Sequence, residues 1–118
     1  PGWSSLNAQF AEVNGERILS VNILFSAAES TTLSNIDPIG DLYSELRELM
    51  ADPLNGAWFS SRITIGKAGD VDVKFDHHDR PRFDPPLHTD DYLEDLQRFP
   101  RTAELPYWHP AALSTIGL

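Results

Sequence analysis

The stretch from Trp58 to Asp79 constrains the fold of this chain most strongly, because its apolar residues alternate in two short runs on either side of a turn. In residues 59–65 and again in residues 71–75, apolar side chains occupy every second position with one exception, a serine. Successive side chains of a strand point to opposite faces, so each run predicts a strand with one apolar and one polar face.

The turn between these runs fixes how the strands pair. Pairing Ile65 with Val71 places both sets of apolar residues on one face and leaves residues 67–69 as a loop. A loop of this length needs a residue with positive φ near its end, and Gly69 meets that need. A shift of one residue would turn charged side chains toward the apolar face, so the pattern predicts a single register.

Residues 3–25 predict a second hairpin. The Asn-Gly dipeptide at 14–15 is a strong signal for a two-residue turn, because both residues tolerate positive φ. Pairing the strands around this turn again brings the apolar residues of both to one face. It also places Glu12 opposite Arg17, which predicts a cross-strand ion pair.

Residues 26–36 show no periodicity and predict a loop. Asp37 as N-cap and Pro38 at the first helical position predict the start of a long helix, which Pro53 brings to an end. The helix carries one apolar stripe, with Glu45 and Arg47 among the residues off it, and we expect the stripe to pack on the sheet. The stripe consists of Ile39, Leu42, Tyr43, Leu46, Leu49 and Met50.

The chain after Asp79 begins with a stiff proline-rich connection over residues 80–86. Thr89 can cap a short helix that ends at Pro100, and residues 101–118 predict an irregular tail partly packed by Tyr107 and Trp108. The sum is one α+β domain over residues 1–118: an antiparallel sheet of about four strands, from two hairpins, packed on one face by one long and one short helix. The strand order and the oligomeric state stay open.

The charge balance narrows the class of partner. Eighteen acidic against nine basic residues give a net charge of −9, which argues against direct binding of nucleic acid and suits a basic protein partner. No apolar run approaches the roughly 18 residues of a membrane span, so no membrane partner is expected. The chain has no cysteine, which is compatible with the reducing cytoplasm, where we expect the protein to act.

Residues 76–79, Asp-His-His-Asp, raise the possibility of a small metal-dependent hydrolase, because histidine and carboxylate are common metal ligands. Adjacent histidines on a strand point to opposite faces, so His77 and His78 would not converge on one ion. The interpretation that we favour is structural: polar residues at a strand end, with no catalytic residue, metal or cofactor. His88 and His109 stand alone, and we expect both at the surface.

The central hairpin resembles that of the YezG-type immunity proteins, small antitoxins that neutralise secreted polymorphic toxins. The matching positions lie within residues 39–79, where an amphipathic helix precedes the hairpin, and His77 departs from the family's usual tyrosine. The segments 83–86 and 91–101 are similar to actinobacterial relatives found with toxins of the tuberculosis-necrotising-toxin type. The hairpin positions that match are Trp58, Ser60, Ile63, Ile65, Gly69, Val71, Val73, Phe75 and Asp76.

The resemblance implies a non-catalytic immunity protein that binds and occludes a cognate toxin, either a nuclease or an NAD glycohydrolase. A non-catalytic accessory domain of a larger toxin is the second hypothesis, and the small hydrolase using residues 76–79 is the third. For the first, we expect an acidic surface with two aromatic anchors to cover a basic cleft. The expected contact residues are Trp58, Asp72, Asp76, Asp79, Phe83, Asp84, Asp90 and Asp91.

Overall fold

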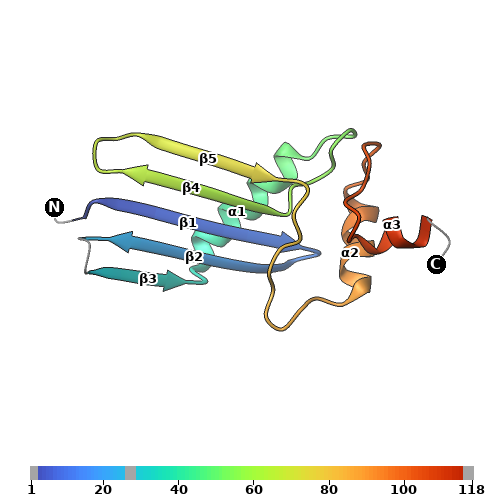
Figure 1. Cartoon of the computed structure of the whole chain (residues 1–118), viewed down its shortest axis with the longest axis horizontal. Coiled ribbons are helices and arrows are strands. Elements are labelled where there is room, and N and C mark those ends of the chain that lie inside the picture. The colour runs from blue at the N-terminus through green and yellow to red at the C-terminus, as the bar shows by residue number, and fades with distance from the viewer. Residues whose placement is uncertain (1–2, 26–28, 116–118) are drawn as a thin grey trace.

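The computed structural model describes residues 3–25 and 29–115 and confirms an α+β fold with an antiparallel sheet. Within those residues the sheet has five strands in the order β3-β2-β1-β4-β5, with α1 on one face and α2 and α3 at one end (Figure 1). The strands are β1 (Ser5–Val13), β2 (Glu16–Leu24), β3 (Ser30–Ser34), β4 (Ser60–Gly66) and β5 (Val71–Asp76). The helices are α1 (Asp37–Met50), α2 (Thr89–Arg98) and α3 (Pro110–Thr115).

Both predicted hairpin registers are confirmed. In the β1–β2 pair Val13 lies opposite Glu16, and in the β4–β5 pair Ile65 lies opposite Val71. The turn residues have the positive φ that their sequence predicts, 52° at Asn14 and 91° at Gly69. Two turns with local sequence signals therefore fix four of the strands.

The loop predicted over residues 26–36 is wrong for residues 30–34, which form the edge strand β3 along β2. Residues 26–28 of that predicted loop lie outside the described residues. All five residues of β3 are exposed, so its sequence lacks the alternation that reveals a half-buried strand. The strand β3 forms instead because its main chain pairs with β2 and because β-branched residues such as Thr31 and Thr32 favour extended backbone.

Both helices begin one residue earlier than their predicted caps imply. Ile36 is the N-cap of α1, with Asp37 as its first residue, and His88 is the N-cap of α2, with Thr89 as its first residue. The main-chain N–H of Asp91 donates to the carbonyl of His88 at 3.1 Å, and the main-chain N–H of His88 donates to Oδ2 of Asp91 at 3.2 Å, so the Asp91 carboxylate caps the start of α2 in place of Thr89.

The main core lies between α1 and the sheet. Phe10 stacks on Tyr43 of α1 with ring centroids 4.8 Å apart and meets Trp58 edge-on at 5.9 Å. Trp58 in turn contacts Phe75 of β5 at 5.4 Å. The buried residues of this core are Ala8, Phe10, Leu19, Val21, Tyr43 and Trp58.

The predicted orientation of α1 is confirmed for Tyr43, which is buried, and for Met50, which packs against the core, but it is wrong for Leu42 and Leu49. The residues that α1 buries are Gly40, Tyr43 and Arg47, whereas Leu42 and Leu49 of the predicted stripe are 66% and 83% exposed. The helix is rolled so that an arginine, predicted to lie off the stripe, faces inward. Part of the apolar stripe is thereby left on the surface.

A second, smaller core holds α2 and the C-terminal segment against the end of the sheet. Val13 and Phe59 pack with Tyr92 of α2, and Trp108 covers them. The predicted packing of Trp108 is confirmed. Tyr107 is 82% exposed, so its predicted packing is wrong, and part of the predicted irregular tail forms α3.

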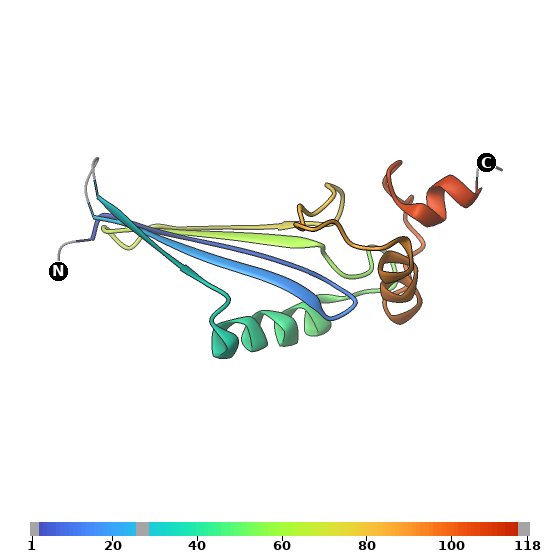
Figure 2. The same ribbon diagram turned by 90° about the horizontal axis from the view of Figure 1, so that it is seen from below.

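The molecule is elongated, with extents of 55 × 28 × 24 Å and a radius of gyration of 16.2 Å. A compact chain of this length would have a radius of gyration of about 13.5 Å. Figure 2 shows the reason: α1 lies under the half of the sheet nearer α2, and the other half extends beyond it. The sheet therefore offers uncovered surface on both faces.

None of the helices in the described ranges combines the length and the apolar character needed to cross a membrane.

Candidate partner-binding surfaces

A groove of about 610 Å³ lies on the face of the sheet opposite α1, between the strands and the segment that follows β5. Its charged lining combines both signs: the acids Asp76 and Asp79 and the bases Arg62, Lys74, Arg80 and Arg82. Asp72 lies on the same face of β5, opposite Thr64 of β4. Three of the expected contact acids thus share a face, but basic side chains are interspersed among them.

Asp76 has a local structural task. Its Oδ1 accepts hydrogen bonds from the main-chain N–H groups of His78 and Asp79, at 2.8 and 2.9 Å. Burial raises the pKa of this carboxyl, but these hydrogen bonds and the nearby charge of His78 outweigh it and hold the pKa below its ordinary value. Asp76 is therefore ionised at neutral pH and shapes the turn that leads out of β5.

The remaining expected acids lie on and before α2. Asp91 accepts hydrogen bonds from the main-chain N–H of His88 and from Asn14 Nδ2, at 3.2 and 3.3 Å, and so ties α2 to the β1–β2 turn. Asp84 and Asp90 are exposed. The structure gathers Asp76 and Asp79 in one groove, whereas Asp91 is engaged at the β1–β2 turn.

The two expected aromatic anchors differ in exposure. Trp58 is 0% exposed, because its side chain turns under α1 before β4 begins and packs between Phe10 and Phe75. A rigid partner cannot contact it. Phe83 is half-buried against the second core and lines a groove of about 650 Å³ between residues 79–83 and Tyr92.

The segment at His77 and His78 anchors the C-terminal region through its main chain. The carbonyl of His77 accepts a hydrogen bond from Arg101 Nη1 at 3.0 Å, and the carbonyl of His78 accepts one from Trp108 Nε1 at 2.7 Å. Burial, reinforced by the charge of Arg101, lowers the pKa of His77. In the part of the chain that the structure describes, no group of three or more histidine and acidic side chains is placed to hold a metal.

His109, expected at the surface, is buried with 2% of its area exposed. It packs beside Phe59 and Tyr92, and its Nδ1 accepts a hydrogen bond from the main-chain N–H of Ala111 at 3.1 Å. Burial and then the charge of Arg101 lower its pKa below the ordinary 6.5. The imidazole is therefore neutral in the folded state at neutral pH.

Because His77 and His109 have lowered pKa values in the folded chain, we expect the stability of the protein to depend on pH. His77 and His109 bind protons more weakly in the folded than in the unfolded chain, so their contribution is complete above pH 6.5 and is lost as the pH falls toward their lowered pKa values. Urea unfolding at several pH values between 7.5 and 5 measures it. The free energy of unfolding should fall over this range, less steeply in His109→Asn; equal slopes in both proteins would contradict the assignment.

The predicted ion pair between Glu12 and Arg17 is wrong, although the two residues do lie opposite each other. Arg17 donates to Asp41 of α1 at 2.7 Å, and Glu12 instead accepts a hydrogen bond from Ser44. Both side chains reach toward α1 because its polar residues lie over this end of the sheet.

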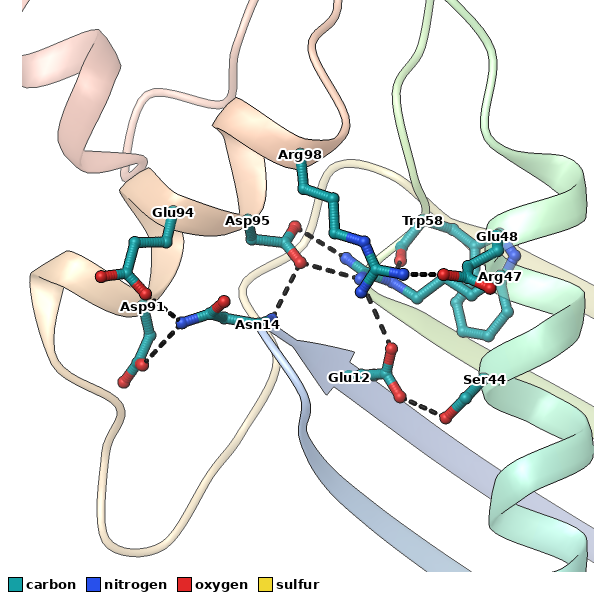
Figure 3. Close-up of polar contacts among 10 residues, drawn as sticks. All are labelled: Glu12, Asn14, Ser44, Arg47, Glu48, Trp58, Asp91, Glu94, Asp95 and Arg98. Carbon is teal, nitrogen blue, oxygen red and sulfur yellow. Dashed lines mark hydrogen bonds and ion pairs between the residues drawn. The ribbon is translucent and has the colours of Figure 1, made fainter.

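Arg47 is the centre of a buried polar network that the sequence did not reveal (Figure 3). Its two terminal nitrogens donate to both carboxylate oxygens of Asp95 on α2, each at 2.8 Å, and its Nε donates to the carbonyl of Trp58 at 2.6 Å. Glu12 lies 3.7 Å from the same guanidinium. Arg47, Asp95 and Glu12 are all buried, so one cation joins α1, α2 and β1.

Asp95 extends the network to the β1–β2 turn, because its Oδ1 also accepts the main-chain N–H of Asn14 at 2.9 Å. An ion pair between Arg98 and Glu48 bridges the two helices at the surface. Arg47 follows Tyr43 by one helical turn, and that spacing was the available sequence signal for its burial. The sequence gave no signal for the burial of Asp95, because α2 carries several acidic residues and nothing in the sequence distinguishes the one that pairs with Arg47.

The roll of α1 leaves an apolar strip, which we call the α1 flank: Ile39, Leu42, Leu46 and Leu49. Successive helical residues are turned by about 100°, so Leu42 and Leu49 lie on the side of α1 opposite Ser44 and Glu48. Those two residues contact the β1–β2 hairpin and α2 (Figure 3). The α1 flank therefore faces the half of the sheet that α1 leaves uncovered.

The face of the sheet that α1 partly covers also exposes apolar residues on the edge strand β5. Val71 and Val73 of β5 are 60% and 44% exposed and share a face with Phe75, which packs against the core beneath α1. Together with the α1 flank they leave aliphatic surface on two elements that meet at an angle. This side of the molecule is the second candidate binding surface.

No protein-family model matches the chain, and a search of curated proteins returned no match.

Proposed function

We propose that the protein is a non-catalytic immunity protein that neutralises a cognate secreted toxin in the cytoplasm by binding its functional domain and covering it. The observation that carries the proposal is the exposed α1 flank, with Leu42 66% and Leu49 83% exposed. The helix buries an arginine on its inner side and turns leucines to water, which is the reverse of what stability alone favours.

An uncovered aliphatic surface of this kind is typical of a protein interface. Leu42 and Leu49 lie two helical turns apart on one side of α1, so one partner surface can contact both. Exposed apolar surface with a polar rim marks interaction sites more often than isolated exposed residues do. Val71 and Val73 of β5 add exposed aliphatic surface on the same side of the sheet.

The charges around the α1 flank favour a basic partner. α1 carries four exposed acids, and Arg17 and Arg98 are the cations that pair with three of them, so the helix keeps a net negative charge. The four acids are Asp37, Asp41, Glu45 and Glu48. The whole chain has a net charge of −9. Complementary charge speeds association and excludes acidic competitors, and the buried aliphatic contact then supplies affinity.

The mechanism requires no reaction. The protein occludes the basic substrate-binding cleft of a nuclease or an NAD glycohydrolase, and substrate cannot enter while the complex lasts. Asp84 and Asp90 stay candidate contacts because their side chains are exposed, whereas Asp72 and Asp79 lie on the face of the sheet opposite α1. The resemblance of residues 39–79 to YezG-type immunity proteins supports the same class of partner.

The experiment is co-purification from the native host, followed by assay of the toxin. We expect a co-encoded basic toxin to be retained at low salt, to dissociate more readily as salt rises, and to lose its enzymatic activity in the complex. Retention without inhibition would favour the accessory-domain hypothesis. No retained toxin at low salt would contradict the proposal.

A further inference from the structure

We propose that the groove opposite α1 is a binding site for a small phosphate-bearing ligand of nucleotide size. It lies on the face of the sheet that α1 does not cover, so it does not depend on the proposed toxin surface.

The distribution of basic residues first points to this groove. The chain has nine lysine and arginine residues, and four of them, Arg62, Lys74, Arg80 and Arg82, line this one groove. Elsewhere Arg17, Arg47 and Arg98 form ion pairs with carboxylates, and Arg101 donates to main-chain carbonyls. Within residues 3–25 and 29–115 the side chains of the four groove cations, like that of Lys67 on the β4–β5 loop, make no hydrogen bond or ion pair with the protein.

The strand register adds a second observation. Arg62 of β4 lies directly opposite Lys74 of β5. Like charges at directly opposed positions destabilise a sheet. No carboxylate lies opposite either cation in this strand pair, although the chain has twice as many acidic as basic residues. Asp76 forms no ion pair with either cation in the part of the chain that the structure describes, and its Oδ1 is directed to the main chain of residues 78 and 79. An anion placed between the two cations would remove the repulsion.

The groove has the size and the lining for a phosphate ester. Its volume of about 610 Å³ falls within the usual range for small-molecule sites. Three of its four cations are arginines, whose planar forks match phosphate oxygens in pairs. Ser20 and Ser60 add hydroxyl groups, and Ile18 adds apolar surface that can contact a base.

The same charges oppose a longer polyanion. The acids Asp76 and Asp79 flank the cations within the groove, and the chain as a whole carries −9. A nucleic acid strand would have to lie along this acidic surface, whereas a mononucleotide needs only the local cations. A small ligand therefore fits the charge distribution better than a polymer.

Isothermal titration with inorganic pyrophosphate and with adenosine diphosphate, at constant ionic strength, tests the site. We expect saturable binding of one molecule per chain. Arg62→Gln and Lys74→Gln should each weaken it about tenfold or more. If adenosine diphosphate binds more tightly than pyrophosphate, the site recognises a nucleotide. If the two bind equally, the site recognises only the phosphate groups.

Two further variants separate binding from folding and from bulk charge. Lys67→Gln removes one positive charge on the β4–β5 loop, outside the groove, and should leave binding unchanged. Lys74→Glu places a carboxylate opposite Arg62, so it should abolish binding while the Tm is maintained or raised. Equal loss in Lys67→Gln, no saturation with either probe, or stronger binding of an acidic peptide or an oligonucleotide would overturn the proposal.

Discussion

Replacing Arg47 by methionine is expected to lower the free energy of unfolding by about 3–5 kcal/mol. The guanidinium is 1% exposed and is shared by Asp95 at 2.8 Å and Glu12 at 3.7 Å, so its removal leaves two buried carboxylates without a cation. The carbonyl of Trp58 also loses its donor. Urea unfolding of the wild type and of Arg47→Met measures the difference.

Arg98→Met is the matched control for Arg47→Met, because it removes the same charge from an exposed ion pair with Glu48. Its effect should lie between about 0 and 1 kcal/mol. A second test replaces Arg47 and both of its carboxylate partners by apolar residues, which should recover most of the loss. Similar costs for Arg47→Met and Arg98→Met would contradict the assignment of Arg47 as the junction of α1, α2 and β1.

Trp58→Ala is expected to lower the free energy of unfolding by a similar amount, about 3–5 kcal/mol. The side chain is 0% exposed and fills the space between Phe10 and Phe75 beneath α1, so truncation leaves a large cavity. Thermal unfolding followed by circular dichroism measures the loss.

Trp58→Phe is the discriminating control for Trp58→Ala. The indole Nε1–H has no hydrogen-bond partner among the described residues, so phenylalanine removes an unpaired polar group while keeping much of the ring. We expect it to cost less than half as much as alanine and to leave partner binding unchanged. Loss of binding by a well-folded Trp58→Phe protein would restore Trp58 as an anchor and contradict its assignment to the core.

The parts of the fold that were predictable are those set by local backbone chemistry. Asn14 and Gly69 demand specific turns, and the alternation beside each turn then leaves one register, which the structure confirms. The edge strand β3 gave no comparable signal, because an exposed strand of serine and threonine needs no alternation. Main-chain pairing with β2 could be seen only in three dimensions.

The candidate surfaces were less predictable, because they depend on how helices sit on the sheet. The spacing of apolar residues on α1 predicts one stripe, but the buried side is selected by Arg47, which finds its carboxylate on α2, 48 residues away in the chain. No local pattern encodes such a pair. The exposed α1 flank follows from it, and the same guanidinium also binds the carbonyl of Trp58.

Net charge alone also concealed the distribution of charge. A chain with −9 overall predicts an acidic surface, yet the face with Asp72 and Asp76 carries Arg62, Lys74, Arg80 and Arg82 as well. The acids of α1 lie on the other side of the sheet, on the helix that also carries the α1 flank. The two faces are therefore suited to different ligands, a basic protein on the α1 side and a phosphate group opposite.

The dissociation constant of the purified toxin, measured for variants on each face, tests the proposed function most directly. Leu42→Asp combined with Leu49→Asp should weaken binding by at least about 100-fold, because both leucines lie at the expected centre of contact. Arg62→Gln combined with Lys74→Gln, on the opposite face, should change it by less than about threefold. Tight binding by the leucine variant, with loss confined to the Arg62 and Lys74 variant, would contradict the account.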